Sequence, residues 1–225
     1  MEIKVVRQIM EWNEDCSAEV KAQLKDNQIY MINVMGSPGA GKTSLIIETA
    51  ARLASTYRVG VIEGDVAGQI DARRIAAHGL PVVQLNTGGA CHIEAMSIKH
   101  ILPHFDLQQI DVLFVENIGN LVCPAEFNIG EDLRLALLSV PEGDDKVEKY
   151  PLMFSVADAL ILHKYDMKQH FAFDDSKVEA QAKAINPAID IFRVSVPQGE
   201  GLTELAKWLT EKIRTSQLSS LSSIL

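Results

Sequence analysis

The chain has 225 residues, of which 47% are hydrophobic and 6% aromatic, and its formal net charge is −9. This length and composition suit one soluble domain, and the negative charge argues against a nucleic-acid partner, which requires a basic surface. No run approaches the roughly 20 apolar residues of a membrane span, and the N-terminus lacks the layout of a signal peptide. Three cysteines are too few for a disulfide framework. We therefore expect a cytoplasmic protein with free thiols and no membrane partner.

The predicted elements alternate between helix and strand along the chain. Spaced apolar residues predict an amphipathic helix over 1–27. Short apolar runs predict strands at 29–35, 58–64, 81–86, 111–117, 157–164 and 190–195. Between and after these strands, helices are predicted from about 42 to 55, 69–78, 92–101, 175–185 and 201–214. This alternation is typical of an α/β fold with a mostly parallel sheet covered by helices on both faces.

The segment 133–154 interrupts this alternation. Two apolar stretches flank the sequence PEGDD, which predicts a short hairpin-like excursion or a long loop outside the core. The serine-rich end after the last helix predicts a fraying tail. Without an internal repeat or a long linker, we expect one domain, 1–225, with the helix 1–27, a core at 28–215 and a tail at 216–225.

The sequence GSPGAGKT fits the phosphate-binding pattern G-x-x-x-x-G-K-[ST] and lies between a predicted strand and a predicted helix. Glycines let backbone N–H groups turn toward phosphate oxygens, and the following helix presents its positive end. Lys42 is placed to bridge the β- and γ-phosphates, and Thr43 to bind Mg²⁺. The fold is therefore predicted to be a P-loop NTPase. Its predicted nucleotide-binding residues are Gly36, Ser37, Pro38, Gly39, Ala40, Gly41, Lys42, Thr43 and Ser44.

Two later strand ends carry candidates for the catalytic site. Glu116 ends the predicted strand 111–117, where P-loop proteins place an acidic residue for the Mg²⁺ shell, and Gly119 follows as a candidate sensor of the γ-phosphate. Asp65 ends the second predicted strand and is a candidate for the Mg²⁺ shell or for orienting the attacking water. The alternative is that Asp65 caps the following helix.

The sequence HKYD at 163–166 follows another predicted strand and resembles the guanine-reading element N-K-x-D. Asp166 is placed to accept hydrogen bonds from the guanine N1–H and 2-amino groups, and Lys164 to lie over the ring. His163 replaces the usual asparagine, which weakens the expectation of guanine affinity. The alternative is an ordinary loop after a strand.

Cys91, His92 and Cys123 follow two different predicted strands. Because loops at the carboxyl ends of parallel strands share one edge of a sheet, two thiols and one imidazole are expected to meet there. This ligand set suits Zn²⁺, Ni²⁺ or Cu⁺, with a fourth ligand from water, a partner or a two-fold dimer. The alternatives are small buried cysteines or, with less support, a Cys–His nucleophile.

The spacing between two of these candidates predicts a switch. Cys123 lies four residues after Gly119, so a shift of this segment on nucleotide hydrolysis would move a metal ligand. The nucleotide state is therefore expected to change the metal affinity.

Five stretches together, GSPGAGKTSL, EGDVAGQIDARRI, LNTGGACHIEA, VENIGNLVCPAEFNIGE and VPEGDDKVEKYPLMF, resemble the HypB family of hydrogenase maturation factors, the nickel-inserting GTPases of [NiFe] hydrogenase assembly. The likeness extends over about residues 30–200. It is specific, because many proteins share a P-loop but few combine it with this Cys-His pair and the Cys-Pro-Ala-Glu-Phe sequence.

The resemblance implies a SIMIBI-class GTPase that hydrolyses GTP to GDP and phosphate and forms a homodimer with GTP. It implies nickel or zinc at the dimer interface through Cys91, His92 and Cys123. It also implies a HypA-type metallochaperone partner and, indirectly, a [NiFe] hydrogenase large-subunit precursor. Family members extend a lysine to the partner's nucleotide, for which Lys149 is the first choice and Lys146 the second. Solvated loop charges are the alternative for both.

Two other functions remain open from the sequence. The first is a GTPase that serves another metal or cofactor client, such as urease or a cobalamin enzyme, although urease relatives carry a Cys-Pro-His element that is absent here. The second is a metal carrier in which the nucleotide site is only structural.

Overall fold

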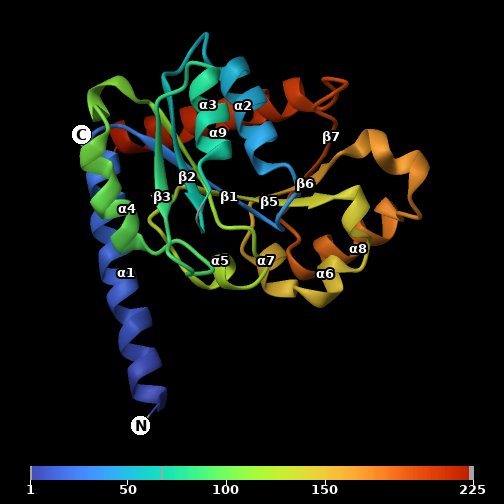
Figure 1. The fold of residues 1–225 in the computed structure, drawn as a ribbon, viewed down its shortest axis with the longest axis horizontal. Helices are drawn as coiled ribbons and strands as arrows, with labels where there is room; N and C mark the ends of the chain where they lie inside the picture. The colour runs from blue at the N-terminus through green and yellow to red at the C-terminus, as the bar shows by residue number, and fades with distance from the viewer. Residues whose placement is uncertain (1, 67, 223–225) are drawn as a thin grey trace.

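The structure is a computed structural model of the chain that describes residues 2–66 and 68–222, with side chains for 10–66 and 68–218. Its strands form one seven-stranded sheet in the order β3-β2-β4-β1-β5-β6-β7 (Figure 1). Every neighbouring pair is parallel. The strands are β1 (Tyr30–Gly36), β2 (Val59–Asp65), β3 (Val82–Asn86), β4 (Val112–Glu116), β5 (Leu133–Ser139), β6 (Ala159–His163) and β7 (Asp190–Val194).

Helices cover both faces of this sheet, as the alternation of the sequence predicts. The α-helices are α1 (Glu2–Asp26), α2 (Lys42–Leu53), α3 (Ile70–Ala77), α4 (Ala95–Ile101), α5 (Cys123–Glu126), α6 (Lys146–Lys149), α7 (Pro151–Ser155), α8 (Asp175–Ile185) and α9 (Leu202–Ser222). Short 3-10 helices are η1 (Leu102–His104), η2 (Leu107–Gln109), η3 (Val140–Glu142) and η4 (Tyr165–His170). The predicted α/β fold with a parallel sheet is confirmed.

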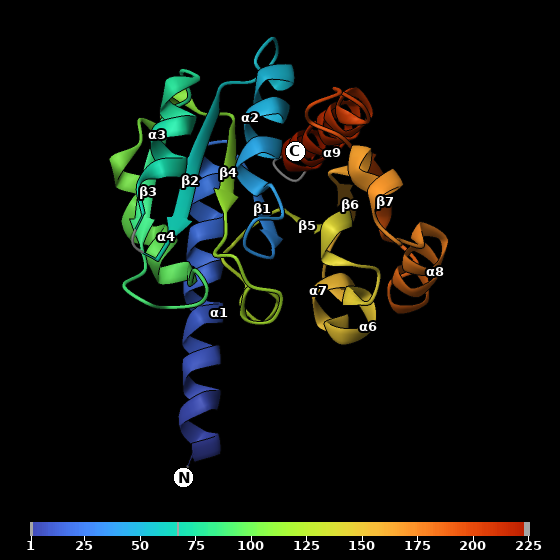
Figure 2. The ribbon, with the colours of Figure 1, turned by 45° about the vertical axis from the view of Figure 1, so that its right-hand side comes forward.

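The central strand β1 contributes side chains to three hydrophobic clusters, one on one face of the sheet and two on the other. Side chains alternate across a strand, so Ile32 and Val34 pack in the core beneath α2 and α9, whereas Met31 and Met35 face the opposite side. That side is covered by α1 and α4 at one end and by α6, α7 and α8 at the other. Because β1 is the middle strand of the sheet, the loop after it starts at the centre of the carboxyl edge (Figure 2).

The predicted hairpin-like excursion at 133–154 is wrong. Residues 133–139 form β5, which runs parallel between β1 and β6 in the middle of the sheet. Its sequence LRLALLS is almost continuously buried, as a strand covered on both faces requires. The polar sequence that follows it begins the helical turn η3, in which Ser139 and Glu142 form a capping box. The remainder folds as α6 and α7.

The ends of two predicted helices also differ. Helix α4 starts at Ala95 and leaves the preceding Cys-His pair in a loop. Helix α9 continues to Ser222, although the sequence predicted a fraying tail from 216, because no glycine or proline follows residue 214 to end it. Residues 223–225 of that tail lie outside the described residues.

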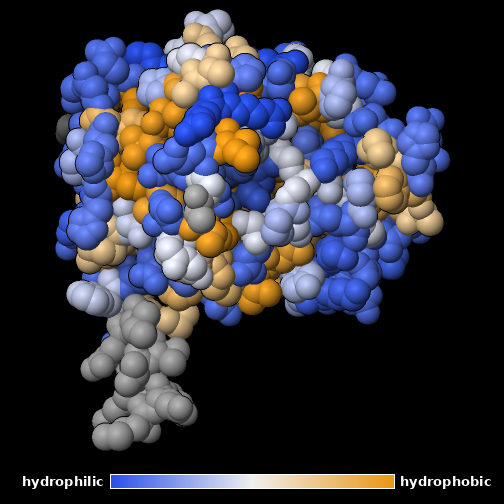
Figure 3. Space-filling view, in the orientation of Figure 1, coloured by the Kyte–Doolittle hydropathy of each residue, from blue (hydrophilic) through white to orange (hydrophobic). Residues whose placement is uncertain are grey.

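The surface mixes polar and apolar residues. Figure 3 shows hydrophilic residues over most of one face, with hydrophobic residues in separate patches between them. Within 2–66 and 68–222, no helix combines the length and apolar content needed to cross a bilayer. The first turns of α1 extend away from the rest of the molecule (Figures 1 and 2).

Candidate functional site

The predicted phosphate-binding loop joins β1 to α2, which is the context that its sequence pattern requires. Lys42 is buried inside the loop, where its Nζ donates hydrogen bonds to the carbonyl oxygens of Gly36 at 3.2 Å and Ser37 at 3.1 Å. Burial lowers the pKa of Lys42, and the nearby Glu116 opposes this shift. The lysine is therefore held at the centre of the loop that would surround the phosphates.

Two glycines allow the close packing around this loop. Gly41 has a φ of +101°, and a Cβ placed on it would lie 2.4 Å from Cε1 of His163. A Cβ on Gly119 would lie 2.7 Å from the backbone nitrogen of Pro38. The structure thus brings Gly119, the candidate γ-phosphate sensor, into direct contact with the phosphate-binding loop.

The candidate Mg²⁺ ligands also lie together. Thr43 Oγ1 donates a hydrogen bond of 2.8 Å to Glu116 Oε1, while the other carboxylate oxygen of Glu116 is buried without a hydrogen-bond partner. Burial raises the pKa of Glu116 to about 7, although Lys42 and Thr43 lower it. A hydroxyl group beside a carboxylate with a free oxygen fits the oxygen ligands that Mg²⁺ prefers.

Glu63 is a buried acid at this site that the sequence analysis missed. It is paired in register with Glu116 across β2 and β4, is 2% exposed and has a buried Oε2 without a hydrogen-bond partner. Burial and then the charge of Glu116 raise the pKa of Glu63 to about 8. A glutamate inside an otherwise apolar strand is itself a signal, because an ionised side chain is costly to bury without a partner.

This raised pKa predicts how the ligand-free protein responds to pH. Between the ordinary glutamate pKa of 4.5 and about 8, the folded protein binds more protons than the unfolded chain, so rising pH reduces its stability. Glu63→Gln should therefore stabilise the protein at pH 8 by on the order of 2 kcal/mol, with little change at pH 5. Urea unfolding in EDTA at both pH values measures this effect. Glu204→Gln, at an exposed position of α9, is the control, and a Glu63→Gln effect independent of pH would contradict the prediction.

Asp65 ends β2 as predicted, but backbone amides occupy both of its carboxylate oxygens. Oδ1 accepts a hydrogen bond from Val66 N at 2.6 Å, and Oδ2 accepts one from Gly68 N at 2.7 Å. Asp65 thus holds the turn that precedes α3, which itself begins with Gln69 as its N-cap. The side chain orders the backbone at the carboxyl end of β2.

The candidate base-reading residues bind neighbouring segments. His163, 2% exposed, donates from Nδ1 to the Ala40 carbonyl at 2.8 Å, since a carbonyl can only accept; burial lowers the pKa of this histidine. Lys164 Nζ donates to Gly39 O at 2.7 Å. Asp166 accepts a hydrogen bond of 2.7 Å from Ser195 Oγ, a partner that the sequence analysis missed. His163 and Lys164 therefore join the end of β6 to the phosphate-binding loop.

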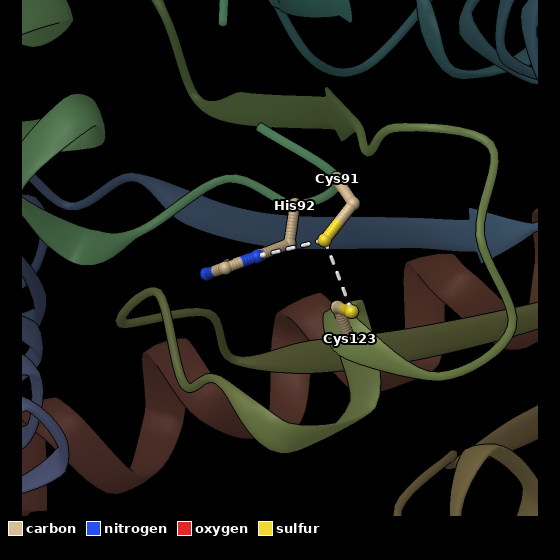
Figure 4. A group of neighbouring side chains, drawn as sticks. All are labelled: Cys91, His92 and Cys123. Atoms are coloured by element: carbon tan, nitrogen blue, oxygen red, sulfur yellow. Dashed lines mark hydrogen bonds between the residues drawn. The ribbon is translucent and has the colours of Figure 1, made fainter. Parts of the chain in front are cut away.

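The cysteine and histidine candidates meet at the carboxyl edge of the sheet (Figure 4). Cys91 Sγ lies 3.1 Å from Cys123 Sγ and 3.7 Å from His92 Nδ1, and the three ligand atoms all lie within 4.8 Å of one another. Cys91 and His92 lie in the loop after β3, where Gly88 and Gly89 adopt positive φ, and Cys123 begins α5. The predicted convergence of two thiols and one imidazole thus occurs.

The environment of this cluster favours a metal site over the alternative of small buried cysteines. Cys91 is exposed and Cys123 partly exposed. The hydrogen bond with Cys91, and then burial, raise the pKa of the Cys123 thiol. The imidazole of His92 stacks on Phe127 at 4.0 Å between ring centroids, which fixes the ring. Although adjacent side chains usually point apart, Cys91 and His92 converge here with a second thiol, a soft ligand set that fits zinc or nickel.

Lys146 and Lys149 lie on α6, beyond the carboxyl end of β5. Both form ion pairs with Asp145, and these contacts hold the pKa of Asp145 well below its ordinary value. The side chain of Lys149 is 59% exposed and that of Lys146 is 22% exposed. Within the single chain, the two lysines are thus paired charges at the surface.

Comparisons with known proteins agree with this arrangement. Residues 30–193 match the family described as CobW/HypB/UreG, nucleotide-binding domain. The hydrogenase maturation factor HypB of Azotobacter vinelandii is 42% identical over 96% of this chain and 71% of its own. HypB of Escherichia coli K12 is 40% identical over 92% of this chain and 71% of its own.

Solved structures give the same result. The crystal structure of HypB from Helicobacter pylori in complex with nickel is 38% identical, with a TM-score of 0.86 over 91% of this chain and 96% of the other. HypB from Archaeoglobus fulgidus is 34% identical, with a TM-score of 0.85 over 91% and 100%. The motifs, the fold and these relatives together show that the chain belongs to the CobW/HypB/UreG family of P-loop NTPases and, within it, to the HypB hydrogenase maturation factors.

Proposed function

We propose that this protein is a GTP-hydrolysing metallochaperone that binds nickel or zinc and delivers nickel during [NiFe] hydrogenase maturation. The observation that carries the proposal is the meeting of Cys91, His92 and Cys123. Cys123 follows Gly119, which packs on the phosphate-binding loop, by only four residues. Nucleotide and metal would therefore bind at one edge of the sheet, where hydrolysis can change the metal affinity. The relatives named hydrogenase maturation factors support this reading.

The nucleotide site has the parts that phosphoryl transfer to water needs. Lys42 would leave the carbonyls of Gly36 and Ser37 to bind the phosphates. Thr43 and Glu116 would hold Mg²⁺, which would supply positive charge to stabilise the phosphates. The N–H of Gly119 would sense the γ-phosphate, and Asp65, which holds the backbone at Val66 and Gly68, would orient the attacking water.

The segment proposed to recognise the base, HKYD at 163–166, departs from the N-K-x-D pattern at its first position. Asp166, oriented by Ser195, accepts hydrogen bonds from guanine, while Lys164 moves from Gly39 to lie over the ring. His163 takes the place of asparagine and keeps its contact with the phosphate-binding loop. The acceptor pair of Asp166 favours guanine over adenine, which has an acceptor at N1.

The metal is the cargo of this protein. Cys91, His92 and Cys123 hold nickel or zinc, and the fourth ligand comes from water, from a HypA-type metallochaperone or from the second protomer of a GTP-dependent homodimer. Lys149, or Lys146 as second choice, would leave Asp145 and reach the nucleotide of the partner. The negative charge of the nucleotide phosphates favours the transfer of the lysine from Asp145 to the nucleotide.

The names of two relatives add a second candidate client. HypB proteins of Helicobacter hepaticus and Helicobacter pylori, 39% and 38% identical to this chain, are named hydrogenase/urease maturation factors. A urease precursor is therefore the second candidate recipient of nickel, besides the hydrogenase large-subunit precursor.

A metal titration tests the proposal. The full chain is titrated with Ni²⁺ in the presence of a non-hydrolysable GTP analogue, GDP or the matching ATP analogue, and the mass of the complex is measured at each step. We expect a dimer and a changed nickel affinity with the GTP analogue, but neither with the ATP analogue. Equal nickel affinity and equal mass in all three nucleotides would overturn the proposed nucleotide-dependent delivery.

A further inference from the structure

The segment 117–123 joins the phosphate-binding loop to the metal cluster through a small number of hydrogen bonds. At one end, Gly119 packs on Pro38 and the backbone N–H of Asn120 donates to Gly36 O at 3.2 Å. At the other end, the segment reaches Cys123, whose sulfur lies 3.1 Å from that of Cys91. Neither end belongs to a regular strand, so the segment can shift without breaking the sheet.

Asn120 contacts both the phosphate-binding loop and the loops that carry the two cysteines. Its Nδ2 donates to the carbonyl oxygen of Cys91 at 3.3 Å, and its Oδ1 accepts from Val122 N at 2.8 Å. Together with its backbone bond to Gly36, one residue thus touches the phosphate-binding loop, the loop that carries Cys91 and the turn that leads to Cys123.

The hydrogen bond from Asn120 N to Gly36 O shares its acceptor with Lys42. In the present structure the Gly36 carbonyl accepts hydrogen bonds from both Lys42 Nζ and Asn120 N. Phosphates would draw Lys42 away from this carbonyl and leave Asn120 as its hydrogen-bond donor. This change of donors would link the position of Asn120 to the occupancy of the phosphate site.

Asn117 provides a second contact of this segment with the loop that follows β3, and it also binds β1, deeper in the protein. Its Oδ1 accepts from Ile93 N at 3.3 Å and from Ile118 N at 2.9 Å, and its Nδ2 donates to Asn33 Oδ1 at 3.1 Å. Because Asn117 is 1% exposed, it fixes the base of the segment, whereas Asn120 lies nearer the surface, where movement costs less packing.

We propose that Asn120 is the positioning residue that couples the phosphate site to the metal cluster, through its backbone bond to Gly36 and its side-chain bond to Cys91. This inference rests on the proposed function, because it concerns the regulation of the same metal site. Coupling between two ligands is reciprocal, so metal must change nucleotide affinity by the same factor as nucleotide changes metal affinity.

Asn120→Asp tests this role with a minimal change. Aspartate keeps the acceptor for Val122 N and thus the local turn, but it cannot donate to the Cys91 carbonyl. Asn128→Asp is the matched control, because Asn128 Oδ1 makes the same two-residue turn with Gly130 N at 2.9 Å and the substitution adds the same charge. Because the extra charge of Asn120→Asp lies near the metal, the uncharged variant Asn120→Ser, whose hydroxyl can also accept from Val122 N, is measured beside it, and both variants should lose the nucleotide dependence.

The experiment measures the Ni²⁺ dissociation constant of the full chain with GDP and with a non-hydrolysable GTP analogue, by competition with a chromophoric chelator. We expect a ratio of at least about fivefold in the wild-type protein and in Asn128→Asp, and a ratio within about twofold of one in Asn120→Asp. The dissociation constants of GDP and of the GTP analogue, each with and without Ni²⁺, should show the same loss of coupling, and thermal unfolding checks the fold.

Different results separate the two proposals. If the wild-type protein binds nickel with a nucleotide-dependent affinity and Asn120→Asp keeps the same ratio, Asn120 is not the coupling residue, while the proposed function stands. If the wild-type protein shows no nucleotide dependence, the proposed gating and the role of Asn120 are both overturned.

Discussion

Lys42→Ala should abolish most nucleotide hydrolysis, with a fall in rate of roughly 10²- to 10³-fold, because one preorganised positive charge at the phosphates is lost. Phosphate release at saturating GTP measures the rate, and GDP titration measures the accompanying loss of affinity. The fold should survive the change. Without Lys42, the carbonyls of Gly36 and Ser37 keep the donors Asn120 N and Ala40 N, each at 3.2 Å.

The control for this experiment is Lys99→Ala, because Lys99 is a partly exposed lysine of α4 that pairs with Glu19 away from the phosphate-binding loop. It should leave hydrolysis unchanged. If Lys42→Ala also leaves hydrolysis unchanged, the enzymatic reading fails and a metal carrier with a structural nucleotide site becomes the better description.

Replacement of the paired thiols should remove metal binding. The double variant Cys91→Ala/Cys123→Ala loses both sulfur atoms of the cluster. Its affinity for Ni²⁺ or Zn²⁺ should fall by more than about a hundredfold, because even the loss of a contact to a metal ligand costs about 10- to 100-fold in affinity. Nucleotide affinity should stay within about twofold, because neither thiol is part of the phosphate-binding loop. Equilibrium dialysis followed by metal analysis gives the metal content per chain.

Cys16→Ala is the matched control, since Cys16 is a buried thiol on α1 and lies outside the cluster. It should bind metal as the wild-type protein does. Wild-type metal content in the double variant would show that the metal binds elsewhere.

The sequence indicated those parts of the site whose signal is local. The phosphate-binding loop is a run of eight residues, Gly36–Thr43, and its chemistry depends on glycines, a lysine and a threonine at fixed neighbouring positions. The strands and helices of the α/β fold follow from periodicity over short windows. Cys91, His92 and Cys123 could also be chosen, because loops after parallel strands share one edge of the sheet.

Local motifs and periodicity could not predict which distant segments make contact in the folded chain. Residues 133–139 looked like part of an excursion because their sequence does not reveal which strands pair with them, and only the sheet shows β5 between β1 and β6. Glu63 became a site residue through its register with Glu116, and Ser195 through its bond to Asp166.

The amino-acid sequence by itself thus determined the class of fold and the phosphate-binding loop, because both are encoded in neighbouring residues, and it predicted Cys91, His92 and Cys123 as candidate metal ligands. The tertiary structure decided how these parts meet, including the 3.1 Å approach of Cys91 to Cys123 across 32 positions and the three-way contact of Asn120. The physical reason is that strand order, register and loop packing are set by burial over the whole chain, which no short window of sequence contains.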